Sequence, residues 1–224
     1  MTEHWNGYHW MDKAEELFLK EVERLENLES VHPRELVNMY DALAGFYYDQ
    51  SQLKKAEEFS SKSIELYERF AAKDPEKYSI DLAASYYNAA CRYSSKENPT
   101  KKEELLLKAI KVLEDSPIIN SDEKVELSFA CFHSLNDLYI FQDRLSEARE
   151  YSKKFEEELE KLLNDDPENY YGWADYLIGA YSTRGEIEEN KTLIDKAFEL
   201  ALRFPESYAA KGMIEDYKKR YGKK

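Results

Sequence analysis

Glycine, proline and cysteine are all scarce in this chain of 224 residues, which holds seven glycines, six prolines and two cysteines. A β-sandwich or a Rossmann-type α/β fold needs many glycine-bearing turns, so both are disfavoured. Cys91 and Cys131 lie inside apolar helical patterns without a paired spacing, which predicts neither a disulfide framework nor a zinc site. The two thiols fit a reducing compartment.

Long hydrophobic runs and an excess of positive charge are missing as well. No apolar run approaches the roughly 20 residues that cross a bilayer, and residues 1–10 do not resemble a secretory signal. We therefore expect a cytoplasmic protein. Lys and Arg number 32 against 46 Asp and Glu, a formal charge of −14. Such a surface repels phosphate backbones and anionic lipids, so neither nucleic acid nor a membrane is expected as a partner.

The motifs that carry chemistry are also absent. The sequence has no glycine-rich phosphate loop, no helical two-histidine metal motif and no nucleophile elbow. His133 and Asp137 lie four residues apart in one helical pattern, and we interpret them as a surface hydrogen bond because no nucleophile accompanies them. The sequence thus predicts a non-enzymatic protein with no catalytic residue, no metal site and no cofactor.

The six prolines suggest where helices begin. Each stands where an apolar helical pattern restarts, and proline is tolerated in the first helical turn. Three of them open a Pro-Glu-x-Tyr tetrapeptide, and Asp74 and Asp166 precede two of these as candidate N-caps. We therefore predict helix starts at Pro33, Pro75, Pro99, Pro117, Pro167 and Pro205.

Tyrosines define an internal repeat. Tyr47, Tyr93 and Tyr139 are spaced by 46 residues, and Tyr181 follows 42 residues later. A second apolar-periodic helix follows each of them, which predicts two helices per repeat. The register places one aliphatic residue four positions before each tyrosine, at Leu43, Ala89, Leu135 and Leu177.

The pattern predicts about ten helices in one domain, residues 1–224. We divide it into a leader and N-terminal helix (1–32), four helix-hairpin repeats (33–205), and a capping helix with a basic tail (206–224). The predicted helices span residues 11–30, 33–49, 53–73, 77–96, 100–115, 121–142, 145–164, 168–184, 187–203 and 206–221.

The repeat resembles the tetratricopeptide repeat (TPR). Its clearest copy combines Tyr40, Leu43, Ala44, Tyr47 and Ala56. The period exceeds the typical 34 residues of that motif, as in long-helix bacterial-type repeats. The resemblance implies an all-α fold, a right-handed superhelical stack of antiparallel helix hairpins known as a TPR-like α-solenoid.

In TPR proteins the first helices of successive hairpins line a concave groove. None of the repeat positions that the resemblance assigns to the groove is Lys or Arg, and several are acidic or aromatic. This favours a protein-interaction adaptor that binds a peptide or helical segment of neutral to basic character. The predicted groove residues are Asn38, Asp41, Tyr48, Asp49, Tyr87, His133, Asp137, Phe141 and Asp175.

Charge also separates the subclasses of TPR proteins. Those that bind chaperones hold an acidic C-terminal tail in a clamp of Lys, Asn and Arg, whereas this chain has Asp41 and Asp175 at two places where the clamp requires a cation. Acidic chaperone C-terminal tails are therefore not expected as partners. Two further functions stay open on sequence grounds, a bacterial TPR peptide-sensing regulatory protein and a TPR-type secretion chaperone.

Overall fold

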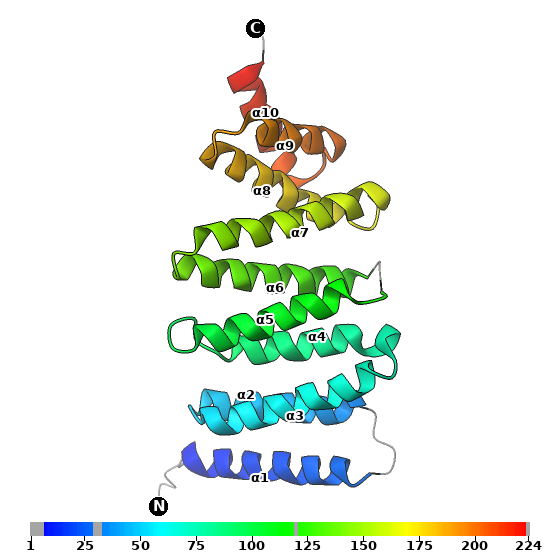
Figure 1. Cartoon of the computed structure of the whole chain (residues 1–224), viewed down its shortest axis with the longest axis vertical. Coiled ribbons are helices and arrows are strands. Elements are labelled where there is room, and N and C mark those ends of the chain that lie inside the picture. Colours follow the sequence, from blue (N-terminus) through cyan, green and yellow to red (C-terminus); the bar gives the residue numbers. More distant parts are fainter. Residues whose placement is uncertain (1–6, 29–32, 119–120, 223–224) are drawn as a thin grey trace, which may run out of the picture. The chain divides into compact units, whose positions relative to one another are not determined.

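The computed structural model describes residues 7–28, 33–118 and 121–222, which form helices joined by turns (Figure 1). Ten α-helices and one 3₁₀ helix, but no strand, occur in these described residues, so the predicted all-α architecture is confirmed. The chain divides into two compact units: unit 1 ends at Leu145 and unit 2 begins at Ser146. The single domain expected from the sequence stays a prediction.

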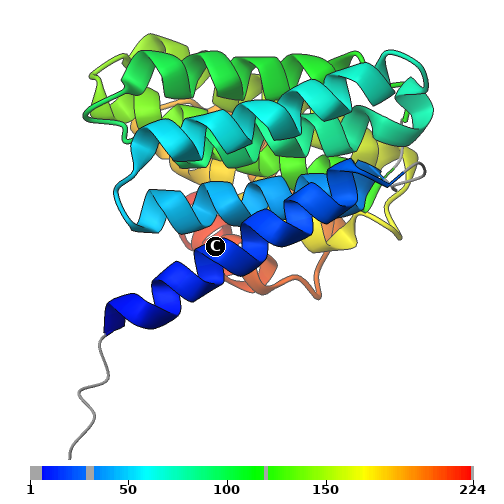
Figure 2. The same ribbon diagram turned by 90° about the horizontal axis from the view of Figure 1, so that it is seen from below.

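Unit 1 is built from six helices, each packed against the next along the chain. Helix α4 also contacts α6, so alternate helices lie next to one another in this part of the unit. Figure 2 shows the N-terminal end of α1 projecting beyond the other helices of the unit. The six helices are α1 (Gly7–Glu26), α2 (Pro33–Asp49), α3 (Leu53–Ala71), α4 (Pro75–Cys91), α5 (Pro99–Glu114) and α6 (Asp122–Phe141).

Unit 2 contains the remaining helices. Helices α8 and α9 form a hairpin, and α10 packs against both of them. The Tyr217 ring of α10 stacks on Phe198 of α9 with the ring centroids 3.9 Å apart. The elements are α7, which starts at the boundary residue (Leu145–Asp165), the 3₁₀ helix η1 (Tyr171–Trp173), α8 (Ala174–Ile187), α9 (Lys191–Arg203) and α10 (Tyr208–Tyr221).

Three of the six prolines begin a helix as predicted, those of α2, α4 and α5. At α4 the carboxylate of Asp74 accepts a hydrogen bond from the Lys77 N–H at 3.2 Å, the cap expected from the sequence. The prediction was wrong for Pro117, Pro167 and Pro205, which lie in the segments before α6, η1 and α10.

Helix α8 starts at Ala174, later than residue 168, where it was expected. The Asp166 carboxylate accepts the Asn169 N–H at 3.3 Å and the Asn169 side-chain amide at 2.6 Å. Asp74 makes the same backbone bond at the start of α4, but after Asp166 only a turn follows, at residues 167–169, before η1. The prediction was also wrong for α1, which spans Gly7–Glu26 and so begins and ends earlier than the expected range 11–30.

The repeating tyrosines join neighbouring helices through a recurring triad. In each triad the tyrosine hydroxyl donates to a glutamate on the preceding helix, at 2.7, 3.0 and 2.8 Å in chain order. A cation bonds the same carboxylate at 3.1, 2.8 and 3.0 Å and lies 4.3 to 5.2 Å from the centre of the tyrosine ring. The triads are Tyr47–Glu15–Lys55, Tyr139–Glu103–Arg144 and Tyr181–Glu160–Lys196.

Three hairpin turns share one backbone geometry. Each has three residues between the helices, and its middle residue is left-handed although it is not glycine: Ser51 and Asp143 have φ of 60°, and Glu189 has φ of 51°. The next N–H in each turn bonds the carbonyl five residues earlier at 2.8 Å. This is the Schellman arrangement that ends many helices, in which glycine is the favoured left-handed residue.

Glu189→Gly is therefore expected to raise the free energy of unfolding by about 1 kcal/mol, because glycine adopts a positive φ without steric strain. Chemical denaturation measures the change. Glu199→Gly is the matched control, since Glu199 is exposed within α9 and glycine there is expected to cost about 1 kcal/mol. A loss of stability in both variants would contradict the assigned turn geometry.

The connection between α4 and α5 differs from these turns. It has seven residues, Arg92 to Asn98, because α4 ends at Cys91 and not near residue 96 as predicted. Ser94 and Ser95 favour a helix weakly, and Asn98 precedes a proline, which disfavours helical backbone at that residue. The register residue Tyr93 consequently lies outside the helix.

Candidate functional site

The predicted groove residues lie on alternate helices. Eight belong to unit 1, on α2, α4 and α6, and Asp175 belongs to unit 2 on α8. Two contacts bring the helices of unit 1 together: Arg92, directly after α4, reaches Asp41 of α2, and Tyr87 of α4 hydrogen-bonds with Ser134 of α6. The first helices of successive hairpins are therefore neighbours in unit 1. That these residues form a ligand groove stays a prediction.

Asp41 has a basic partner that the sequence analysis missed. The Arg92 guanidinium donates to the Asp41 backbone carbonyl at 3.1 Å, lies 3.8 Å from its carboxylate, and donates to Ser60 Oγ at 3.2 Å. Burial raises the pKa of Asp41, while Arg92 and hydrogen bonds from Ser63 and Asn88 oppose that rise. No assigned groove position is itself Lys or Arg, but a cation from outside those positions lies beside Asp41.

Arg92 was missed because it follows α4 and so lies outside the repeat positions assigned to the groove. One signal was available in the sequence. Arg92 is the first charged residue after Asp81, and an arginine in so apolar a stretch is buried only where it is paired.

Asp175 stabilises the start of α10. Its carboxylate accepts a hydrogen bond from the Ala209 N–H at 2.6 Å. Burial raises the pKa of Asp175, but hydrogen bonds from Ala209, Ser207 and Tyr208 outweigh this effect and leave the pKa below its usual value. A carboxylate at a helix N-terminus is stabilised by the helix dipole, so Asp175 has a structural contact inside unit 2.

The remaining predicted residues divide into one that is partly buried and six that are exposed. Tyr87 is partly buried, and burial raises the pKa of its hydroxyl, which hydrogen-bonds with Cys91 as well as Ser134. His133 and Asp137 form the expected pair on the surface of α6, with Nδ1 and Oδ2 separated by 3.3 Å. Asn38, Tyr48, Asp49 and Phe141 are exposed to solvent.

Exposed apolar side chains gather where the hairpins of unit 1 turn. Tyr48 and Leu53, at the α2–α3 turn, are 38% and 48% exposed. Ile140, Phe141 and Leu145, at the turn after α6, are 52%, 61% and 57% exposed. Figure 1 shows these two turns and the α4–α5 connection on the same side of unit 1. Side chains able to contact a partner therefore follow this edge.

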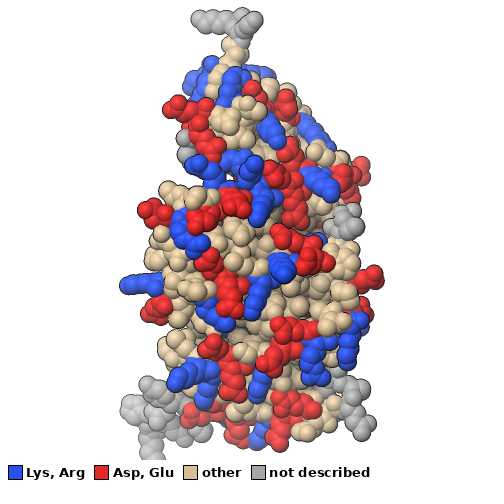
Figure 3. Space-filling model, in the orientation of Figure 1, with Lys and Arg blue, Asp and Glu red and all other residues tan. Residues whose placement is uncertain are grey.

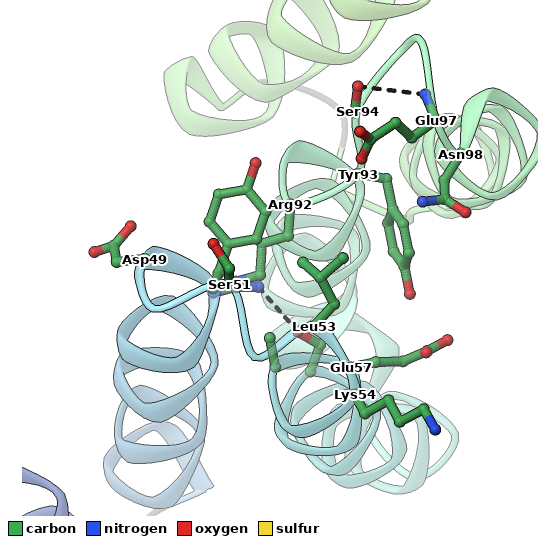
Figure 4. Close-up of a pocket in the computed structure, with 13 residues that line it drawn as sticks. Asp49, Ser51, Leu53, Lys54, Glu57, Arg92, Tyr93, Ser94, Glu97 and Asn98 are labelled. Carbon is green, nitrogen blue, oxygen red and sulfur yellow. Dashed lines mark hydrogen bonds between the residues drawn. The ribbon is translucent and has the colours of Figure 1, made fainter.

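A pocket of about 680 Å³ opens on this edge, between the α2–α3 turn and the α4–α5 connection (Figure 4). We call it the turn pocket. Among the predicted groove residues it contains Tyr48 and Asp49. Its lining consists of Tyr48, Asp49, Ser51, Leu53, Lys54, Ala56, Glu57, Ser60, Arg92, Tyr93, Ser94, Glu97 and Asn98.

The long α4–α5 connection supplies one wall of the turn pocket. Tyr93 hydrogen-bonds through its hydroxyl to Glu57 of α3, and burial together with this bond raises the pKa of the tyrosine. Glu97 donates its backbone N–H to Ser94 Oγ at 3.4 Å, as Figure 4 shows. The sequence analysis missed this wall because it continued the helix to residue 96. The pairs Ser94-Ser95 and Asn98-Pro99 were the loop signals.

The charges on the surface are mixed. Figure 3 shows Lys and Arg interspersed with Asp and Glu over the face in view, without a broad field of one sign. Within the described ranges, no group of three His, Cys, Asp or Glu residues is placed to hold a metal ion. No helix in the part of the chain that the structure describes is both long and apolar enough to cross a membrane.

No protein-family model matches the sequence, and no curated protein matches it. Solved structures do. The chain is similar to TPR-like repeats of a putative kinesin light chain from Podosopora anserina, with a TM-score of 0.53 and 20% identity over 90% of this chain and 91% of that chain. BtubC (BKLC) from P. vanneervenii aligns with a TM-score of 0.49 and 18% identity, over 88% and 76% of the two chains. The fold of this chain is thus that of a TPR-type helical repeat protein.

Proposed function

We propose that this chain is a non-enzymatic adaptor of the cytoplasm that binds a peptide or helical segment of another protein along α2, α4 and α6. The observation that carries the proposal is the set of exposed aromatic and acidic side chains on α2 and α6, above all Tyr48, Asp49, Asp137 and Phe141. A TPR-like repeat fold supports the role of an interaction scaffold.

The aromatic and acidic residues have different roles in this proposal. Exposed ion pairs stabilise a complex by only about 0.2 to 1 kcal/mol each, so the carboxylates govern association rate and partner choice. Aromatic rings bury a large area at low cost in rotamer entropy and supply most of the affinity. The preferred segment is neutral to basic.

Acidic chaperone tails are not expected as partners. The Arg92 cation beside α2 already contacts Asp41 and Ser60. A carboxylate tail would approach Asp49 and Asp137 as like charges, which is repulsive.

Binding kinetics with a partner purified from the protein's own cells test the proposal. Asp137→Asn is expected to slow association about two-fold and to reduce its dependence on salt, because long-range attraction is screened by salt. Phe141→Ala is expected mainly to speed dissociation, by about ten-fold, because it removes exposed apolar contact area. Surface plasmon resonance at two salt concentrations measures both rates.

Glu126→Gln is the control, since Glu126 is exposed on the same helix and is not among the predicted groove residues. Unchanged rates in both Asp137→Asn and Phe141→Ala would exclude α6 from the binding face. The identity of the purified partner also discriminates: a secreted substrate would favour the secretion chaperone, and a signalling peptide the sensor.

A further inference from the structure

The turn pocket forms beside a connection that is longer than the three hairpin turns described above. The turns after α2, α6 and α8 each have three residues, whereas the α4–α5 connection has seven. The additional residues place Tyr93, Ser94, Glu97 and Asn98 opposite the start of α3 (Figure 4). The volume of about 680 Å³ lies inside the range of roughly 300 to 1,000 Å³ that is usual for ligand pockets.

The body of the turn pocket is apolar and aromatic. Leu53, about half exposed, lies between Arg92 and Tyr93 in Figure 4. Tyr48 and Ala56 complete this surface. A long side chain with a methylene stem can lie against such residues while its charged end stays near water. A planar guanidinium can also stack on a tyrosine ring.

The rim of the turn pocket is acidic. Asp49 ends α2, Glu57 lies on α3, and Glu97 lies on the α4–α5 connection, so acidic residues from three elements line the pocket, and Glu57 is also bonded by the Tyr93 hydroxyl. Two cations, Lys54 and Arg92, share the lining. The guanidinium of Arg92 is directed to the Asp41 backbone and Ser60 and has the Asp41 carboxylate 3.8 Å away. Lys54 extends outward from α3 in Figure 4.

We infer that the turn pocket binds an arginine of the partner segment, together with the residues on either side of it. The guanidinium lies among the rim carboxylates, and the stem packs against Leu53 and the tyrosine rings. Arginine is favoured over lysine because its planar fork can bond a carboxylate through two N–H groups and stack on an aromatic ring. This inference rests on the proposed function for the source of the segment, and adds the residue that the segment must carry.

The test uses capped tetrapeptides as probes, the acetylated and amidated peptide Gly-Arg-Leu-Gly and its citrulline counterpart. Citrulline has the shape of arginine without its charge. Methyl NMR of the full chain is expected to show shifts at Leu53 and Ala56 on titration with the arginine peptide. The citrulline peptide is expected to bind at least five-fold more weakly, and a lysine peptide is expected to have an intermediate affinity.

Two variants probe the rim and the body. Combining Asp49→Asn with Glu97→Gln is expected to lower the affinity for the arginine peptide about five-fold and to leave the affinity for the citrulline peptide unchanged. Leu53→Ser is expected to lower the affinity for both peptides. The matched control is Glu58→Gln, because Glu58 is the exposed neighbour of Glu57 and does not line the pocket. Methyl signals of buried residues far from the pocket verify that each variant is folded.

Equal affinity for the arginine and citrulline peptides would overturn the inference, as would shifts confined to residues outside the pocket or tighter binding of a glutamate peptide. The proposed function fails separately. It fails if Asp137→Asn and Phe141→Ala leave partner kinetics unchanged while the arginine peptide still binds at Leu53. The inference alone fails if those two variants alter the kinetics but the peptide does not bind there.

Discussion

Replacing Arg184 with methionine is expected to lower the free energy of unfolding of unit 2 by about 1 to 2 kcal/mol at pH 8. Arg184 of α8 forms an ion pair with Glu156 of α7, and the two side chains are only 17% and 4% exposed. Methionine fills a similar volume but provides no charge. The Glu156 carboxyl would then be buried without a counter-ion, and at pH 8 it either keeps its proton or bears an unpaired charge, both of which favour the unfolded chain.

The loss is expected to depend on pH. Burial raises the pKa of Glu156 to about 7 from its usual 4.5, although Arg184 acts to lower it. The folded protein therefore holds this proton more tightly than the unfolded chain, so stability falls as pH rises from about 4.5 to about 7 and then levels off. Without Arg184 the pKa is higher still, and the fall continues above pH 7. The two proteins should differ little at pH 5 and most at pH 8.

Amide hydrogen exchange of α8 at pH values between 5 and 8 measures this effect locally. Arg149→Met is the control, because Arg149 pairs with Glu188 from a largely exposed position, and little change is expected. Combining Arg184→Met with Glu156→Leu is expected to restore most of the stability, since both charges are then absent. An equal loss at pH 5 and pH 8 would show that Arg184 does not affect the protonation of Glu156, and would contradict the prediction.

Leu135→Ala is expected to lower the free energy of unfolding of unit 1 by about 2 to 5 kcal/mol. Leu135 lies at the repeat position four residues before the register tyrosine and is 0% exposed, as are Leu43 and Leu177 at the same position. Truncation removes apolar contacts and leaves a cavity, because closely packed neighbours relax only in part. Chemical denaturation measures the loss for the whole protein, and amide hydrogen exchange of α6 measures it locally.

The second repeat offers the reverse experiment. It has Ala89 at this position, buried to 2% exposure, and Ala89→Leu is expected to cost about 1 to 3 kcal/mol by overpacking. Leu145→Ala is the exposed control, for which little change is expected because Leu145 is more than half exposed. A Leu135→Ala protein as stable as this control would show that the repeat register does not describe the core.

Sequence reasoning succeeded where the physical signal is local. The period of apolar residues along a helix is set by its 3.6 residues per turn, so the all-α architecture and the paired helices could be predicted. The cap at Asp74 requires only the backbone N–H of Lys77, three positions along the chain. Helix α2 was predicted at its observed bounds, Pro33–Asp49, and the repeat position of Leu135 predicted a buried residue.

Tertiary structure decided the features that join distant segments. Arg92 meets Asp41 across 51 residues, and Asp175 bonds the Ala209 N–H across 34. No repeat position encodes such contacts, since they depend on how packed helices place long side chains. The end of α4 likewise depended on a distant contact. Ser94 and Ser95 favour a helix only weakly, and Tyr93 bonds Glu57 of α3 from outside the helix. That early end lengthened the connection to α5, and the longer connection supplies one wall of the turn pocket.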